Sequence, residues 1–128
     1  MKILLVDDKA SIRTAMKKIL MDLGMEDITE AIDGEEAWHE VNNAYLRGED
    51  ARYDLIVSDM EMPKMTGLEL LRSVRNSDDL KFTPFIMATT VTAKQIIIET
   101  MRLGVQAYII KPFDAPMVEL KLKQAGIL

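Results

Sequence analysis

Short apolar runs of strand length alternate with longer segments of helical periodicity along the whole chain. This alternation predicts βαβ units, in which consecutive strands pair in parallel and a helix covers each crossover. We therefore expect an α/β fold, a doubly wound (βα)5 sandwich of three layers built on a parallel sheet. The expected strands are residues 2–6, 28–31, 55–58, 85–89 and 107–110.

Helical signals fill the intervals between these runs. Gly24 follows an apolar stripe and suits a left-handed helix end, and Thr66 is a good N-cap for a helix that continues to Arg75. The other helices are expected from about residue 35 to Gly48, from 93 to 103 and from 115 to 124. Five βα units then use the whole chain, so we expect residues 1–128 to form a single domain without an output domain.

Composition narrows the function classes. The chain has 128 residues, 48% of them hydrophobic, which suits one globular domain. No apolar run is long enough to insert into a membrane, and the absence of cysteine fits a cytoplasmic protein. A net charge of −5 argues against nucleic-acid binding, which needs a basic surface.

Polar side chains follow four of the five expected strands. Asp7 and Asp8 follow the first, Asp59 the third and Lys111 the fifth, while Thr89 ends the fourth. In an open α/β sheet, ligands bind outside the carboxyl ends of the strands, so these groups should meet at one edge. Three neighbouring carboxylates repel one another, and a hard oxygen-binding cation such as Mg²⁺ would relieve that repulsion.

The strand-end residues together are suited to phosphoryl transfer onto an aspartate. A carboxylate at position 59 can act as a nucleophile toward phosphorus, and Lys111 and Thr89 can pair with and donate to phosphoryl oxygens. Each residue alone also has an ordinary structural explanation. Asp7 and Asp8 suit a helix N-terminus, Asp59 a turn, Thr89 a strand, and Lys111 a solvated loop.

These residues resemble the receiver domain of bacterial two-component response regulators, and most of all the stand-alone chemotaxis type. The resemblance covers essentially the whole chain and rests on an ordered set of motifs. The set comprises Asp7–Asp8, Asp59 with Pro63 and Gly67, Thr89, and Lys111–Pro112–Phe113. It implies a flavodoxin-like fold with the parallel strand order 2-1-3-4-5.

The resemblance also implies a role for each site residue. Asp59 matches the phosphoacceptor that takes a phosphoryl group from a sensor histidine kinase. Asp8, Asp59 and the backbone carbonyl of Glu61 match the Mg²⁺ ligands, and Asp7 matches an acidic residue that holds the ion through water. Thr89 matches the switch hydroxyl, Lys111 the phosphoryl-binding lysine and Tyr108 the switch aromatic. The Lys111–Pro112 bond is often cis in the family.

The chain departs from the family pattern at three residues and in the length of one segment. Glu61 adds a carboxylate at the pocket mouth, Thr90 is bulkier than the usual residue, and Val91 lacks a polar side chain. These three residues therefore leave the rate of dephosphorylation undetermined. The segment between Asp8 and Asp59 is also long. We place its extra residues at about 42–54, at the sheet edge opposite the site, as a surface insertion or a partner contact.

Three consecutive isoleucines, Ile96, Ile97 and Ile98, fall on the expected fourth helix. Neighbouring helix positions point about 100° apart, so at least one should be exposed. In receivers, the fourth helix, fifth strand and fifth helix form the usual partner face. One hypothesis is that the isoleucines and Tyr108 form a docking patch for a downstream protein; the alternative is scattered surface apolarity. The protein would be a monomer or a weak homodimer.

Three competing functions stay open at this point. A Mg²⁺-dependent phosphatase with an aspartate nucleophile would normally carry a second Asp where this chain has Glu61. A flavodoxin-like cofactor binder would need a phosphate-cradling first loop, and Asp7–Asp8 would repel phosphate. A phosphorylation-independent interaction module would have no need of the full set of strand-end residues.

Overall fold

The computed structural model describes all residues from Met1 to Leu128. Five parallel strands form one sheet in the order β2-β1-β3-β4-β5, as the resemblance implies. The strands are β1 (Lys2–Val6), β2 (Asp27–Ala31), β3 (Leu55–Ser58), β4 (Phe85–Thr89) and β5 (Ala107–Ile110). The predicted strands are confirmed, and only β2 differs, since it begins one residue earlier.

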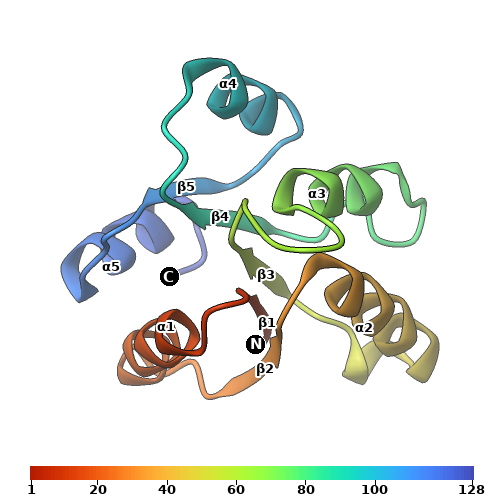
Figure 1. Ribbon diagram of the computed structural model, residues 1–128. Helices are drawn as coiled ribbons and strands as arrows, with labels where there is room; N and C mark the ends of the chain where they lie inside the picture. The colour runs from red at the N-terminus through yellow and green to blue at the C-terminus, as the bar shows by residue number, and fades with distance from the viewer.

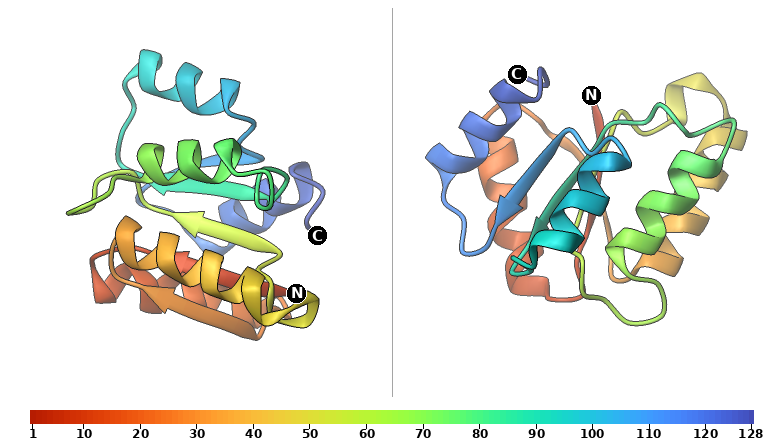
Figure 2. Two further views of the ribbon diagram at one scale, coloured as in Figure 1. Left: turned by 90° about the vertical axis from the view of Figure 1, so that its right-hand side faces the viewer. Right: turned by 90° about the horizontal axis from the view of Figure 1, so that it is seen from above.

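Helices cover both faces of the sheet, as Figures 1 and 2 show, with α1 and α5 on one face and α2, α3 and α4 on the other. This is the three-layer arrangement expected from the sequence. The helices are α1 (Ala10–Asp22), α2 (Gly34–Arg47), α3 (Gly67–Asn76), α4 (Lys94–Arg102) and α5 (Ala115–Gln124), with a short 3-10 helix, η1 (Glu49–Ala51). None of the helices has both the length and the apolar content that crossing a bilayer would require.

The sheet separates two apolar cores because successive side chains of a strand point to opposite faces. In β1, Leu4 and Val6 pack under α2 and α3, whereas Ile3 and Leu5 pack under α1 and α5. The central strands are therefore apolar on both faces, as is typical of parallel sheets covered by helices. This double burial fixes the register of the strands, and with it the position of the residue that follows each strand.

Local sequence signals set the helix ends. Thr66 caps α3 in a reciprocal capping box with Glu69, as the Thr66 prediction requires. Gly24 has φ +90°, the left-handed conformation predicted for the residue after α1. At α2, the Asp33 side chain accepts the Glu36 N–H at 2.8 Å and is the N-cap of the helix.

The long segment 42–54 forms the end of α2, η1 and the approach to β3. Its last residue, Asp54, bonds to the start of β1, because the Lys2 N–H donates to Asp54 Oδ2 at 2.7 Å and the Asp54 N–H donates to Lys2 O at 2.8 Å. The segment therefore reaches the amino ends of the strands, which is the edge predicted for it and the edge away from the strand-end residues.

Candidate functional site

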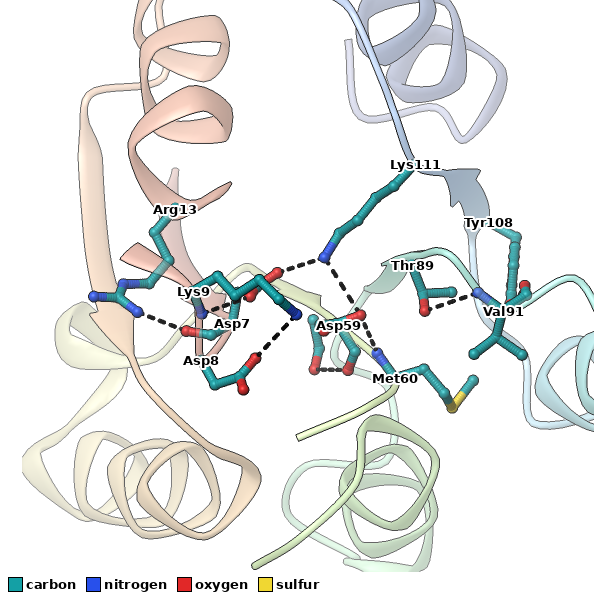
Figure 3. A network of polar contacts seen from close by, with 11 residues as sticks. Asp7, Asp8, Lys9, Arg13, Asp59, Met60, Thr89, Val91, Tyr108 and Lys111 are labelled. Carbon is teal, nitrogen blue, oxygen red and sulfur yellow. Dashed lines mark hydrogen bonds and ion pairs between the residues drawn. The ribbon is translucent and has the colours of Figure 1, made fainter. Parts of the chain in front are cut away.

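The carboxyl edge of the sheet brings together residues at the ends of four strands (Figure 3). The hydrogen-bond ladder continues one residue past β1, β3 and β5: Asp7 N donates to Ala31 O at 3.2 Å, Asp59 N to Val6 O at 2.9 Å, and Lys111 N to Thr89 O at 2.9 Å. Because these main-chain positions are part of the sheet, their side chains leave it from fixed points. The predicted convergence of Asp7, Asp59 and Lys111 is a direct result of the parallel register.

Three carboxylates form an acidic cluster at this edge. One oxygen each from Asp7, Asp8 and Asp59 lies within 4.8 Å of the other two. Asp7 and Asp59 are buried, at 2% and 4% exposure, whereas Asp8 is exposed. An all-oxygen donor set that is open to water on one side fits Mg²⁺, a hard ion that usually keeps several water ligands.

Lys111 supplies the positive charge inside the cluster. Its Nζ lies 2.7 Å from Asp7 Oδ2 and 3.4 Å from Asp59 Oδ1, and its side chain is only 8% exposed. The Lys111 ammonium therefore contacts two of the three carboxylates, and the exposed Lys9 pairs with the third only at 3.9 Å, so the site keeps an excess of negative charge. A divalent cation or a protein cation can neutralise that excess, and an incoming phosphoryl group alone cannot.

Asp7 is held from several directions. Its Oδ1 accepts the Lys9 N–H at 2.9 Å, its Oδ2 accepts from Lys111, and its main-chain oxygen accepts Arg13 Nη1 at 2.7 Å. Asp8, in contrast, has only a long ion pair with Lys9 at 3.9 Å, so its carboxylate is free to bind an ion directly. Arg13 was not among the predicted site residues, although a cation about one turn after an acidic pair was an available signal.

The turn that carries Asp59 is shaped by a close approach of α3. A Cβ built on Gly67 would lie 2.0 Å from the Asp59 main-chain oxygen, so only glycine fits there. The Gly67 N–H donates to Met60 O at 2.9 Å, and the Met60 N–H donates to Asp59 Oδ1 at 2.8 Å. The sequence indicated a loop at Gly67. The structure shows that this glycine positions the turn under the carboxylate.

Thr89 and Tyr108 are joined through one residue, Val91. The fully buried Thr89 accepts the Val91 N–H on its Oγ1 at 3.2 Å, and the Tyr108 hydroxyl donates to Val91 O at 2.8 Å. Burial, together with the charge of Asp59, raises the pKa of Tyr108. The side chain of Tyr108 therefore lies inward, next to the loop that follows β4.

The inward position of Tyr108 bears on the expected docking patch. Tyr108 is only 9% exposed and its hydroxyl bonds to Val91 O, so in this conformation it adds little exposed surface to a patch with the isoleucines. The isoleucine prediction itself is confirmed: Ile98 is 41% exposed, while Ile96 and Ile97 are half-buried against the core.

The remaining predicted residues surround the entrance to the site. An open cavity of about 330 Å³ at this edge is lined by Lys9, Ile12, Asp59, Glu61, Thr90, Lys111 and Pro112. Glu61 and Thr90 are exposed at its rim, and Val91 is half-buried behind them. The Lys111–Pro112 bond is cis, as the resemblance implies. The cavity leads from solvent to the Asp59 carboxylate, so a phosphoryl donor has a route to it.

Comparisons with known proteins agree with this geometry. Residues 3–123 match the response regulator receiver domain. Chemotaxis protein CheY of Pseudomonas aeruginosa is 38% identical over 124 residues, which cover 97% of this chain and 94% of that protein. Chemotaxis protein CheY-3 of Vibrio cholerae is 39% identical over 122 residues, which cover 95% of this chain and 88% of that protein.

Solved structures give the same result at the level of the fold. The chemotaxis response regulator CheY4 of Vibrio cholerae superimposes with a TM-score of 0.82 at 36% identity, and 97% of each chain is covered. Relatives and structures are thus matched almost from end to end, over the same elements that build the acidic edge. The chain belongs to the family of response regulator receiver domains.

Proposed function

We propose that this protein is a phosphorylation-controlled switch of a two-component pathway. Asp59 accepts a phosphoryl group from the phosphohistidine of a sensor histidine kinase, with Mg²⁺ as cofactor, and the change alters the binding of a downstream protein. The observation that supports this most directly is the convergence of Asp7, Asp8 and Lys111 on the buried carboxylate of Asp59.

The hydrogen bonds of Asp59 indicate which oxygen reacts. Oδ1 accepts the Met60 N–H and lies 3.4 Å from Lys111 Nζ, whereas Oδ2 accepts no hydrogen bond from the protein. In the proposed reaction, Oδ2 forms a bond to phosphorus while the bond between phosphorus and the histidine nitrogen breaks, and the imidazole leaves with its electron pair. Asp59 Oδ1 stays fixed by its donors, which orients the nucleophile.

The metal-binding part of the proposal assigns Asp8, Asp59 and the backbone carbonyl of Glu61 as direct ligands, with Asp7 acting through water. Asp8 suits a direct role because its carboxylate is exposed and weakly paired, and Asp7 suits an indirect one because both its oxygens already accept hydrogen bonds. When bound, Mg²⁺ would neutralise the carboxylates and the phosphoryl oxygens.

Lys111 and Thr89 are the proposed phosphoryl-binding groups. Lys111 Nζ is an ammonium with three protons, so it can keep its contact with Asp7 and also donate to a phosphoryl oxygen. The Thr89 hydroxyl already accepts from Val91 N, which leaves its own hydrogen free to donate. A phosphoryl oxygen that binds this hydrogen would stabilise the arrangement in which Val91 also accepts from Tyr108.

The proposed output surface comprises α4, β5 and α5, where Ile98 is the exposed isoleucine. A phosphoryl group can change partner affinity only if it favours one of two conformations, and the link from Thr89 through Val91 to Tyr108 is the candidate for that two-state element. Glu61, Thr90 and Val91, at or next to the cavity rim, would set the phosphoryl lifetime through access of water.

In this proposal residues 1–128 work as one receiver domain in the cytoplasm, as a monomer or a weak homodimer. The curated relatives carry the name of chemotaxis proteins, so a role in chemotaxis signalling is the pathway we propose first. Receiver domains of this kind are signalling switches and not classical enzymes.

Incubation with a small acyl phosphate, with and without Mg²⁺, tests the proposal by intact mass. The wild-type protein should gain one labile phosphoryl group only in the presence of Mg²⁺, and Asp59→Asn should gain none. Thr89→Ala should still gain the group but lose its effect on partner binding. A stable wild-type mass under saturating acyl phosphate and Mg²⁺ would refute the assignment of Asp59.

A further inference from the structure

Arg75, near the carboxyl end of α3, joins two segments that are distant in sequence. Its guanidinium donates to main-chain oxygens on both sides. The acceptors are Lys81 O (3.1 Å) and Thr83 O (2.7 Å) in the loop before β4, and Leu103 O (2.7 Å) and Gly104 O (3.0 Å) at the end of α4. We call Arg75 and these four carbonyl groups the Arg75 junction. It lies at the edge of the sheet opposite the acidic cluster.

The junction satisfies carbonyl groups that α4 cannot satisfy by itself. The last carbonyls of a helix have no partner within the helix, and a cation is favourable there because of the helix dipole. Arg75 Nε and Nη2 reach Leu103 O and Gly104 O from another helix, so α3 supplies the cap of α4. The guanidinium is planar and donates in fixed directions, which sets the angle between the two segments.

The two ends of α4 are held very differently. At the carboxyl end, Thr100 is fully buried, and Arg75 of α3 donates to Leu103 O and Gly104 O. At the amino end, Ala93 makes no side-chain cap, and residues 92–95 are all exposed. Figure 1 shows α4 as the outermost helix at the top of the molecule, joined to the sheet by a loop at each end. The carboxyl end of α4 is therefore fixed to α3 by hydrogen bonds. Its exposed first turn receives no hydrogen bond from α3, and the amino half is held by the loop after β4 and by the apolar packing of Ile96 and Ile97.

The amino end of α4, which lacks the hydrogen bonds from Arg75, is also the end next to the switch residues. The loop of residues 90–93 begins beside Thr89, and Val91 within it contacts both Thr89 Oγ1 and the Tyr108 hydroxyl. A displacement that starts at Thr89 would thus reach α4 at its amino end first. At the other end, the hydrogen bonds from Arg75 oppose movement of Leu103 and Gly104.

We propose that Arg75 is a positioning residue of the switch. It fixes the carboxyl end of α4, so that the response to phosphorylation is confined to the loop after β4 and the amino half of α4. This inference rests on the proposed function for its trigger and adds the part of the molecule that must stay still. A helix that is fixed at one end changes its direction when the other end moves, whereas an unfixed helix would shift or fray as a whole.

Hydrogen exchange of the backbone amides measures this directly in the full chain. The wild-type protein is compared with and without acyl phosphate and Mg²⁺. We expect a phosphorylation-dependent change within about residues 90–98 and none at 101–104, where Leu103 N and Gly104 N donate to carbonyls of α4. In Arg75→Met the change should extend into 101–104, and exchange there should rise on the order of tenfold even without phosphorylation.

Arg72→Met is the matched control, because Arg72 is on the same helix and pairs with α4 only through exposed side chains. It should leave the wild-type pattern in place. Arg75→Lys keeps the charge but donates from a single nitrogen, so it should give an intermediate pattern and serves if Arg75→Met does not fold. A purely structural role for Arg75 would raise exchange in both states equally and leave the phosphorylation-dependent difference where it was.

The outcomes separate this inference from the proposed function. Intact mass of the same samples reports whether Asp59 has gained its phosphoryl group. If it has, a change at 101–104 in wild type equal to that at 90–98 overturns the role of Arg75. If it has not, the proposed function fails, and the unphosphorylated proteins then decide whether Arg75 fixes the end of α4. Faster exchange confined to residues 101–104 in Arg75→Met supports a fixed carboxyl end, and a uniform increase of exchange along α4 overturns it.

Discussion

Replacing Lys111 with methionine removes the only cation inside the acidic cluster and keeps a side chain of similar length. Lys111 Nζ lies 2.7 Å from Asp7 Oδ2 and 3.4 Å from Asp59 Oδ1. At an effective dielectric constant of about 20, unit charges at these distances attract by about 6 and about 5 kcal/mol. Desolvation of the buried ammonium and carboxylates offsets most of that attraction, at several kcal/mol per ion.

The net loss of stability depends on the Asp7 and Asp59 carboxylates, which stay buried when Lys111 is removed. Removing one member of a buried ion pair destabilises a protein by about 3–5 kcal/mol, because the remaining charges stay buried without compensation. We expect about 3 kcal/mol here, the lower end, since exposed Asp8 admits water to the cluster. With about 1–3 kcal/mol per molar urea for the dependence on denaturant, the unfolding midpoint should fall by about 1–3 M.

Urea unfolding in the presence of a chelator, followed by far-ultraviolet circular dichroism, measures this loss. Saturating Mg²⁺ should raise the urea midpoint of both proteins, because an ion that binds only the folded state stabilises it, by about 2.7 kcal/mol at a hundredfold excess over its Kd. The rise should be larger in Lys111→Met, because its acidic cluster carries one more uncompensated negative charge. The Mg²⁺ would then replace the missing positive charge.

The matched control is Lys123→Met on α5, which removes an exposed lysine paired with Glu119 at 3.4 Å. Exposed pairs contribute about 0–1 kcal/mol, so this variant should unfold close to wild type. A loss of under about 1 kcal/mol for Lys111→Met, or an equal Mg²⁺ effect in both proteins, would refute the reasoning that Lys111 neutralises the cluster.

Three further predictions concern the support of the site and the opposite edge. Gly67→Ala should destabilise the fold by more than about 2 kcal/mol and slow phosphorylation from acyl phosphate, because a Cβ would lie 2.0 Å from Asp59 O; Ser73→Ala on the same helix is the control. Thr66→Ala should lose about 1 kcal/mol in urea unfolding while phosphorylation persists, because it removes the α3 cap. Burial raises the pKa of Tyr53 to about 12, above its usual value of about 10, so the folded state holds this proton more tightly. The stability that the folded protein gains from this proton is complete below about pH 10 and is lost as the pH rises toward about 12. The urea unfolding midpoint should fall over this window in wild type and less steeply in Tyr53→Phe.

The main features of the fold could be predicted because they depend on local patterns. The strand runs, the Thr66 cap and the left-handed Gly24 are each set by neighbouring residues, and the structure confirms all three. The convergence of Asp7, Asp59 and Lys111 was also predictable, since parallel strands place their carboxyl ends at one edge. Strand order was available only from the resemblance to receivers.

Other features could not be predicted, because they depend on which side chains meet across the fold. Tyr108 was expected to form a docking patch with the isoleucines, and its inward position depends on the Val91 carbonyl, which belongs to the loop after β4. Apart from its place in the receiver motif, Gly67 was predicted only as a loop residue, since its closeness to Asp59 O arises when the start of α3 lies against the turn after β3. Arg75 carried no signal at all, because its acceptors are main-chain oxygens that any residue could provide.

The elements, the polar residues at four strand ends and the family of the chain can all be inferred from the order of residues, because periodicity, caps and ordered motifs are local properties. The tertiary structure alone decided that Asp7 is paired with Lys111 and Asp8 is left free, and that the carboxyl end of α4 is fixed by α3. The contact between Asp7 and Lys111 joins residues 104 positions apart, and a contact of that range exists only once the sheet order and the packing of its helices are set.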